Sequence, residues 1–148
     1  MKQNHLTSLI SVLSCLNAFA QQSTEVYLAD LKLENDSLRI EGVINISNNE
    51  GYDNQPSFFD NDKILFASTR NQQTDIVLYT IKDGTSEWIT NSPKGSEYSP
   101  LKIPGKDAIS TIRLDDDGLQ RLYEYDLKTG KSSMLLHDLK VGYHVWYS

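Results

Sequence analysis

Two serine-containing turns come nearest to a catalytic motif in this sequence. Serine hydrolases place the nucleophile in a Gly-x-Ser-x-Gly turn and pair it with an acid and a histidine. The closest strings are Gly84-Thr85-Ser86-Glu87-Trp88 and Gly130-Lys131-Ser132-Ser133-Met134, and both lack the second glycine. Neither string predicts an activated serine, and we expect that the chain is not an enzyme.

The histidines and one acidic turn are the groups that could bind a metal. Beyond residue 20 the histidines are His137 and His144, and neither stands in a His-x-x-x-His or His-Glu pair. In an EF-hand register of the turn Asp115–Gly118, position one falls on Arg113, where calcium requires an oxygen ligand. We therefore interpret Asp115–Gly118 as a hairpin turn, and we expect no metal and no cofactor.

The stretch from Gly51 to Thr90 shows how the chain is organised. It contains four short apolar runs separated by three polar turns, which predicts one four-stranded antiparallel sheet. A second copy begins at Gly95, where Gly95-Ser96-Glu97-Tyr98-Ser99-Pro100 aligns with Gly51-Tyr52-Asp53-Asn54-Gln55-Pro56. Repeated four-stranded units of about 40 to 45 residues are typical of a β-propeller.

The repeat divides residues 21–148 into parts of a propeller. We predict half a blade at 25–47, full blades at 51–90 and 95–137, and the start of a further blade at 142–148. The strands carry apolar residues at both odd and even positions, so each sheet needs a neighbour on both faces. A β-sandwich of about ten strands is the alternative, but its strands have no reason to repeat a unit. The fold class is therefore all-β, an incomplete β-propeller of about two and a half blades.

Polar and aromatic residues at the starts of the units are the candidate binding residues. At these positions they could face the channel of a propeller or line a surface for a carbohydrate or peptide. The candidates are Tyr52, Asp53, Asn54, Tyr98, Tyr143, His144 and Trp146. Packing between blades is the favoured alternative for the aromatic ones, as it is for Trp88 in the fourth strand.

The unit 51–90 resembles the WD-like repeat of TolB-type propellers. That repeat runs from Pro-x-aromatic through a hairpin and an apolar strand to Ser-Asp-Arg, then Asp-Ile-Tyr, an Asp/Gly turn and Leu-Thr. The matching residues are Pro56, Phe58, Asp60 to Lys63, Ile64 to Ala67, Ser68-Thr69-Arg70, Asp75-Ile76, Asp83-Gly84 and Ile89-Thr90. Thr69 replaces the aspartate, and the first hairpin has no glycine. The resemblance covers roughly residues 25–148 and implies a secreted or periplasmic propeller, not the role of TolB itself.

Residues 1–20 have the features of a secretory signal peptide. An apolar core from Leu6 to Leu16 is too short to span a bilayer, and Ala18-Phe19-Ala20 predicts cleavage after Ala20. The mature protein would be periplasmic or secreted, with no transmembrane segment. A lipidated Cys15 is the alternative, although Val12-Leu13-Ser14 before it fits a lipoprotein signal poorly.

The small number of predicted blades and the acidic net charge both indicate which partners the chain could have. Propellers close with four to eight blades, so we expect this chain to be a truncated piece of a longer propeller or to close by self-association. An open fragment that leaves about four large apolar side chains uncovered forfeits roughly 6–12 kcal/mol, comparable to the net stability of a domain. A formal net charge of −6 argues against a nucleic-acid partner.

Three functions fit these observations. We favour a non-catalytic module of the bacterial envelope that binds or scaffolds proteins or peptides. The first alternative is the N-terminal propeller of an exported serine exopeptidase, since TolB-like repeats also occur attached to such hydrolases. The second is a propeller that binds a carbohydrate or another ligand through channel aromatics.

Overall fold

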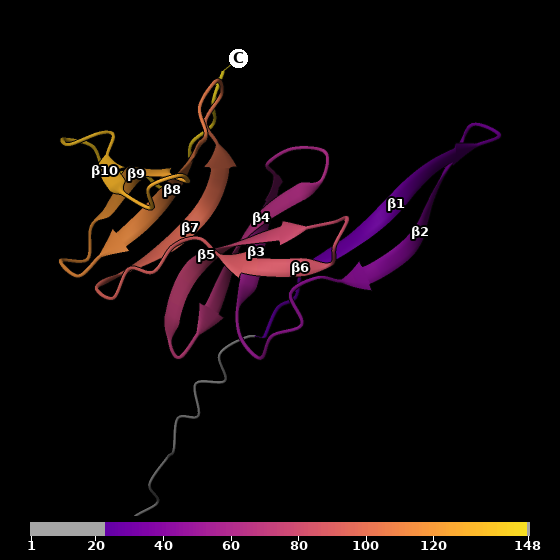
Figure 1. Ribbon diagram of the computed structural model, residues 1–148, viewed down its shortest axis with the longest axis horizontal. Helices are drawn as coiled ribbons and strands as arrows, with labels where there is room; N and C mark the ends of the chain where they lie inside the picture. The colour runs from indigo at the N-terminus through magenta and orange to yellow at the C-terminus, as the bar shows by residue number, and fades with distance from the viewer. Residues whose placement is uncertain (1–22, 148) are drawn as a thin grey trace, which may run out of the picture.

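The computed structural model describes residues 23–147, which contain ten strands and form three antiparallel sheets (Figure 1). The predicted signal peptide at 1–20 lies outside these residues. No helix in the described part of the chain is long and apolar enough to cross a membrane. The all-β fold class is confirmed.

Two of the sheets are four-stranded meanders, in which each strand pairs with its neighbours in sequence. The first sheet comprises β3 (Asp53–Phe58), β4 (Lys63–Arg70), β5 (Gln73–Thr80) and β6 (Thr85–Trp88). The second comprises β7 (Gly95–Lys102), β8 (Ala108–Asp115), β9 (Gln120–Asp126) and β10 (Ser132–Met134). Their spacing agrees with the repeat in the sequence, and each has the strand order of a propeller blade.

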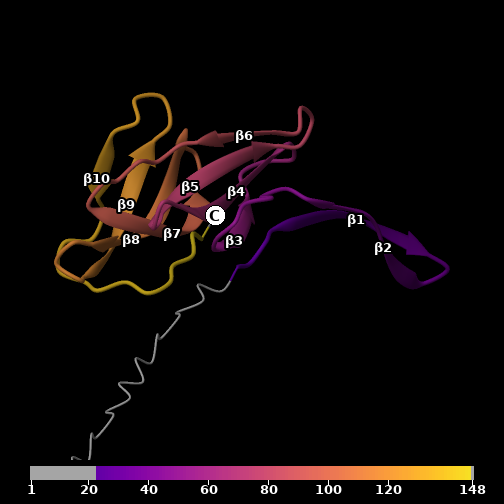
Figure 2. The ribbon, with the colours of Figure 1, turned by 90° about the horizontal axis from the view of Figure 1, so that it is seen from below.

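The third sheet is a hairpin of β1 (Tyr27–Glu34) and β2 (Ser37–Asn45), which we call the arm. It projects from the two stacked sheets as a separate ribbon (Figures 1 and 2). Asn35 and Asp36 form its turn with φ of 49° and 59°, the left-handed pair that two-residue hairpin turns require. This turn sets the pairing of Leu33 with Leu38 and so the register of the distal arm.

The two four-stranded sheets pack face to face around a buried apolar cluster. Leu65, Ala67 and Ile76 of the first sheet meet Ile109 and Tyr125 of the second, with Tyr123 beside them. The opposite face of the first sheet is covered by Val26 and Ile46, which flank the arm and which we call its base. That second cluster contains Val26, Ile46, Ile64, Phe66, Val77 and Tyr79. The first sheet is therefore covered on both faces, as its apolar residues at odd and even positions predict.

Candidate functional site

The innermost strands β3 and β7 carry equivalent bulges. The pairing register shifts between Asn54 and Ser57 in β3 and between Tyr98 and Leu101 in β7. Gln55 and Ser99 lie within these shifts with φ of 55° and 50°, values that are uncommon outside glycine. A bulge bends its strand and redirects its side chains, so both inner strands turn at the same point of the repeat.

The bulges also connect the two sheets through hydrogen bonds. The backbone N–H of Ser99 donates to Oε1 of Gln55 at 2.9 Å, and the Ser57 hydroxyl donates to the carbonyl of Pro100 at 2.6 Å. Farther along the junction, the Gln73 amide donates to the carbonyl of Gly95. These hydrogen bonds hold β3 of the first sheet beside β7 of the second. A binding surface along these strands would therefore include residues of both sheets.

Three of the sequence candidates, Tyr52 just before β3 and Asp53 and Asn54 at its start, differ in exposure. Asn54 is exposed, and its amide donates to the Tyr52 hydroxyl at 3.1 Å. Asp53 is buried, receives a 3.3 Å hydrogen bond from Asn49, and has its pKa raised by burial. Tyr52 and Asn54 are thus available to a partner, while Asp53 belongs to the interior.

Two further candidates, Tyr98 and Tyr143, meet at one hollow of about 400 Å³. Tyr98 comes from β7, whereas Tyr143 comes from residues 142–147, which we call the C-terminal segment. Ile112 and Leu114 supply an apolar wall, and Gln55 and Gln120 supply amides. The hollow therefore offers both stacking surfaces and hydrogen-bonding groups.

The C-terminal segment lies on the second sheet without forming a strand. Ser110 of β8 anchors it: Nε2 of His144 is 2.6 Å from the Ser110 hydroxyl oxygen, and the Trp146 indole donates to that oxygen at 2.8 Å. Burial lowers the pKa of His144, which favours the neutral ring. His144 and Trp146 thus pack inward, in agreement with the packing alternative.

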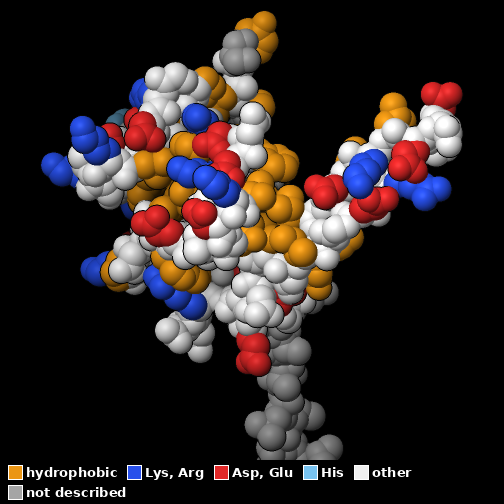
Figure 3. Space-filling view, turned by 45° about the vertical axis from the view of Figure 1, so that its right-hand side comes forward, with side chains coloured by type: hydrophobic (Ala, Val, Ile, Leu, Met, Phe, Trp, Pro, Cys, Tyr) orange, Lys and Arg blue, Asp and Glu red, His pale blue; other side chains and the backbone are white. Residues whose placement is uncertain are grey.

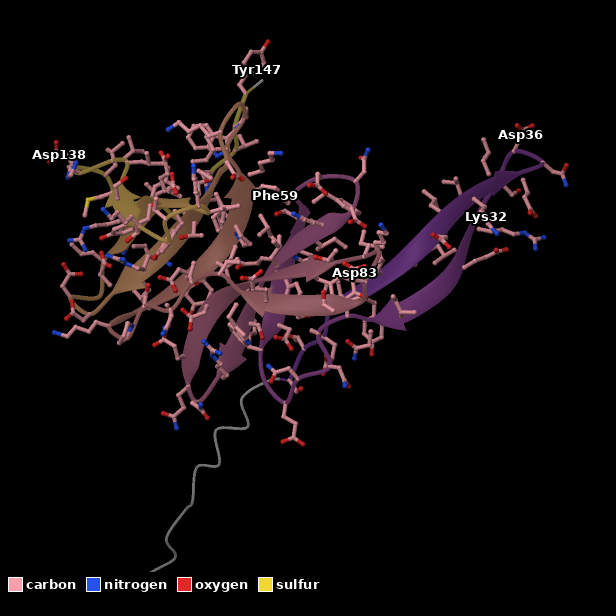
Figure 4. All side chains as sticks on the ribbon, in the orientation of Figure 1. Lys32, Asp36, Phe59, Asp83, Asp138 and Tyr147 are labelled. Atoms are coloured by element: carbon pink, nitrogen blue, oxygen red, sulfur yellow. The ribbon has the colours of Figure 1, made fainter. Side chains whose placement is uncertain are left out.

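The alternate residues of the C-terminal segment face solvent. Tyr143, Val145 and Tyr147 are 84%, 86% and 100% exposed, and we call them the outward row. Figure 4 shows Tyr147 projecting from the end of the body. The segment thus combines anchored and free side chains in strict alternation, as a strand does.

A buried polar network between the sheets was not found from the sequence. Asp75 of β5 and Glu97 of β7 are fully buried; the Tyr125 hydroxyl donates to Glu97 Oε1 at 2.7 Å, and the Ser92 N–H donates to Asp75 Oδ1 at 3.1 Å. The hydroxyl oxygens of Ser92 and Tyr125 lie 3.1 Å apart, and this contact connects the hydrogen bonds of Asp75 and Glu97 into one network. Burial raises the pKa of Glu97 to about 7, and the Asp75 carboxyl acts in the same direction.

The acidic turn forms ion pairs with arginines. Asp115 accepts hydrogen bonds at 2.6 Å from both Arg113 and Arg121, and Arg121 also pairs with Asp117 at 2.7 Å. The hydrogen bonds from Arg121 lower the pKa of Asp117 to about 2. Within residues 23–147 no group of three or more His, Cys, Asp or Glu side chains is placed to hold a metal. The ion pairs give these carboxylates a structural role at the end of the second sheet.

The arm has two chemically different faces. Leu31 pairs with Ile40 and Leu33 with Leu38, and these four side chains are 65 to 70% exposed. The intervening positions are charged, with Lys32 and Glu41 2.6 Å apart. In Figure 3 the arm shows mainly charged side chains to the viewer, while apolar ones gather on the body beside it. The alternation from Asp30 to Glu34 in the sequence is the signal that could have predicted this.

Comparison with known proteins supports the fold. No family model matches the chain, and no curated protein matches it. Among solved structures, one described as "putative TolB from Agrobacterium tumefaciens" matches with a TM-score of 0.56 and 19% identity. The match covers 74% of this chain and 45% of that chain, so this chain spans under half of that protein. At this identity the likeness concerns the fold alone: the described sheets have a TolB-like, β-propeller-type arrangement.

Proposed function

We propose that this chain is a non-catalytic, exported module that binds proteins or peptides through the C-terminal segment. The outward row is the observation that carries the proposal. Tyr143, Val145 and Tyr147 are almost fully exposed, yet the segment that bears them is held on the second sheet by Ser110. Rigid, exposed aromatic side chains are the residues that supply most contact energy at protein interfaces.

The backbone of the segment supports the same function. Its side chains alternate between exposed and part-buried from Tyr143 to Tyr147, and it forms no strand within the described residues. A partner strand can pair with such a backbone, while pockets on the partner receive alternate side chains. The neighbouring hollow beside Tyr98 would accept one further side chain of a bound peptide.

Export is proposed from the first twenty residues, and the TolB-like fold is in keeping with it. A fusion of residues 1–22 to a reporter enzyme that is active only outside the cytoplasm tests this part. Reporter activity is expected, and its loss on replacing Leu9 and Val12 with arginine would confirm that the apolar core directs export. An inactive fusion contradicts it.

Site-specific photo-crosslinking tests the binding function. A photoreactive phenylalanine at Val145 should give a discrete adduct with an envelope protein, whereas the same group at Asp83, in the turn between β5 and β6, should not. Both positions are exposed, so neither replacement disturbs the core. Equal labelling from both positions, or none from Val145, would contradict the proposal.

The hollow of about 400 Å³ favours a second candidate, a small polar ligand such as a carbohydrate. Tyr98 and Tyr143 could stack against a sugar ring while Gln55 and Gln120 bond its hydroxyls. A glycan array separates the two functions: binding that is lost with Tyr98→Ala supports the ligand, and adducts from Val145 without glycan binding support the protein partner.

A further inference from the structure

The arm carries an interaction surface that is independent of the C-terminal segment. Along β1, Tyr27, Ala29, Leu31 and Leu33 alternate with Leu28, Asp30, Lys32 and Glu34. The register places Leu38 and Ile40 of β2 beside Leu33 and Leu31. We call the resulting set the apolar face of the arm. It comprises Tyr27, Ala29, Leu31, Leu33, Leu38 and Ile40, all of them exposed.

The opposite face of the distal arm is suited to water. Lys32 pairs with Glu41 at 2.6 Å, and Arg39 lies 3.5 Å from Glu34. These groups are 43 to 65% exposed, so their ion pairs form at the surface. The charged face of the distal arm is therefore well solvated, whereas its apolar face is exposed to water and would be stabilised by an apolar partner surface.

We infer that the apolar face of the arm binds the same face of a second copy of this chain. The face contains no charge, so two copies related by a two-fold axis meet without repulsion or an unpaired ion. Leu31 and Leu33 lie opposite Ile40 and Leu38 within each arm, which gives a compact four-residue centre for the contact. The charged faces then point outward on both sides of the pair.

The area of the contact is sufficient for a specific dimer. Five large side chains, each about two-thirds exposed, remove on the order of 500 Å² per chain and 1,000 Å² in total on pairing. This is the lower limit for a specific interface, so the dimer should dissociate in the micromolar range. A two-stranded hairpin is also marginal by itself, and the contact would give it the second layer it lacks.

Sedimentation velocity over about 1 to 100 µM tests the inference. The average mass of the chain should rise from that of one copy toward that of two. Leu31→Glu should weaken the association more than about tenfold, because the contact would bury an unpaired charge. Arg39→Gln, on the charged face of the same hairpin, should leave it unchanged.

A charge exchange then tests whether arm meets arm. Leu31→Glu and Leu31→Lys are each expected to be monomeric, and an equimolar mixture should recover dimers because opposite charges meet across the two-fold axis. Leu31 is exposed, so these variants should melt at the wild-type temperature in dilute solution. A wild-type chain that stays monomeric at the highest concentration overturns the inference. So does a dimer that Leu31→Glu leaves intact, or a mixture that remains monomeric.

Discussion

The Tyr125 hydroxyl reaches Glu97 Oε1 at 2.7 Å across an intervening strand, because β8 separates β9 from β7 in the second sheet. The Ser92 hydroxyl contacts the same phenol at 3.1 Å, and the Ser92 N–H bonds Asp75 of the first sheet. Glu97 Oε2 and Asp75 Oδ2 have no hydrogen-bond partner in the part of the chain described. Two buried carboxyls therefore lie near each other at the junction of the sheets, with Arg70 4.0 Å from Asp75 Oδ2, and the Asp75 carboxyl helps to raise the pKa of Glu97.

This network predicts that stability falls as pH rises toward neutrality. The folded pKa of Glu97 is about 7 against 4.5 for an ordinary glutamate, so the folded chain retains a proton that the unfolded chain releases. The stabilisation is fully present below about pH 4.5 and is lost as pH rises through 7, by up to about 3 kcal/mol. Urea unfolding at intervals from pH 5 to 8 measures it.

Glu97→Gln is the matched control for the pH dependence. The amide keeps an acceptor for Tyr125, supplies a donor toward Asp75, and does not titrate. The slope of unfolding free energy against pH should therefore flatten between pH 5 and 7. If the variant keeps the wild-type slope, a group other than Glu97 causes the pH dependence of the unfolding free energy.

Among the apolar contacts, those between the two four-stranded sheets should lose the most stability on mutation. Ile109 is fully buried and packs against the first sheet, so Ile109→Ala should cost about 2 to 5 kcal/mol. Leu33→Ala in the arm removes a similar side chain from an exposed position and should cost less than about 0.5 kcal/mol. Urea titration of dilute protein compares them. Equal losses would mean that the sheets are not packed as described.

Calcium should not stabilise the acidic turn. Asp115 is already paired with Arg113 and Arg121, so adding millimolar calcium or a chelator should leave the melting temperature unchanged. Asp115→Asn should lower stability by about 1 to 3 kcal/mol, because two arginines lose their charged partner. A calcium-dependent rise in melting temperature would argue for a metal role instead.

The Ser110 hydroxyl should hold the C-terminal segment on the second sheet. Ser110→Ala removes the oxygen that contacts both His144 and Trp146, so the segment should lift from the second sheet. Acrylamide quenching of Trp146 fluorescence, measured in a Trp88→Phe background, should increase. Ser57→Ala, which removes a hydroxyl elsewhere in the structure, should leave the quenching unchanged.

The repeat made most of the fold predictable. Each strand of the two meanders pairs with its neighbour in sequence, so local turns and apolar runs determine the sheets without long-range information. The predicted apolar runs Ile64–Ala67 and Ile76–Tyr79 fall within β4 and β5. The polar start of β3 was harder to assign, since its bulge at Gln55 interrupts the alternation on which strand prediction depends.

The site was less predictable because its contacts join distant residues. The repeat includes Asp75 and aligns Glu97 with Asp53, but a position in the repeat does not show that an acid is buried. The burial of Asp75 and Glu97 depends on how the sheets stack. Asp53, expected at a binding surface, is buried too, beside Thr24, Asn49 and Ser68, which no local pattern in the sequence brings together. Tyr98 and Tyr143 were identified separately by their places in the repeat, but only the path of the C-terminal segment brings them together.

The meander topology also bears on how the chain acquires its structure. Every ladder in the two main sheets joins strands adjacent in sequence, so each sheet can form before the other is complete. The arm comes first in the chain, yet the base of the arm depends on β4 and β5 for its cover. During synthesis Val26 and Ile46 at the base of the arm therefore remain exposed until the first sheet has formed. The distal Leu31, Leu33 and Leu38 stay exposed afterwards, so the proposed pairing of two arms would follow the folding of each chain.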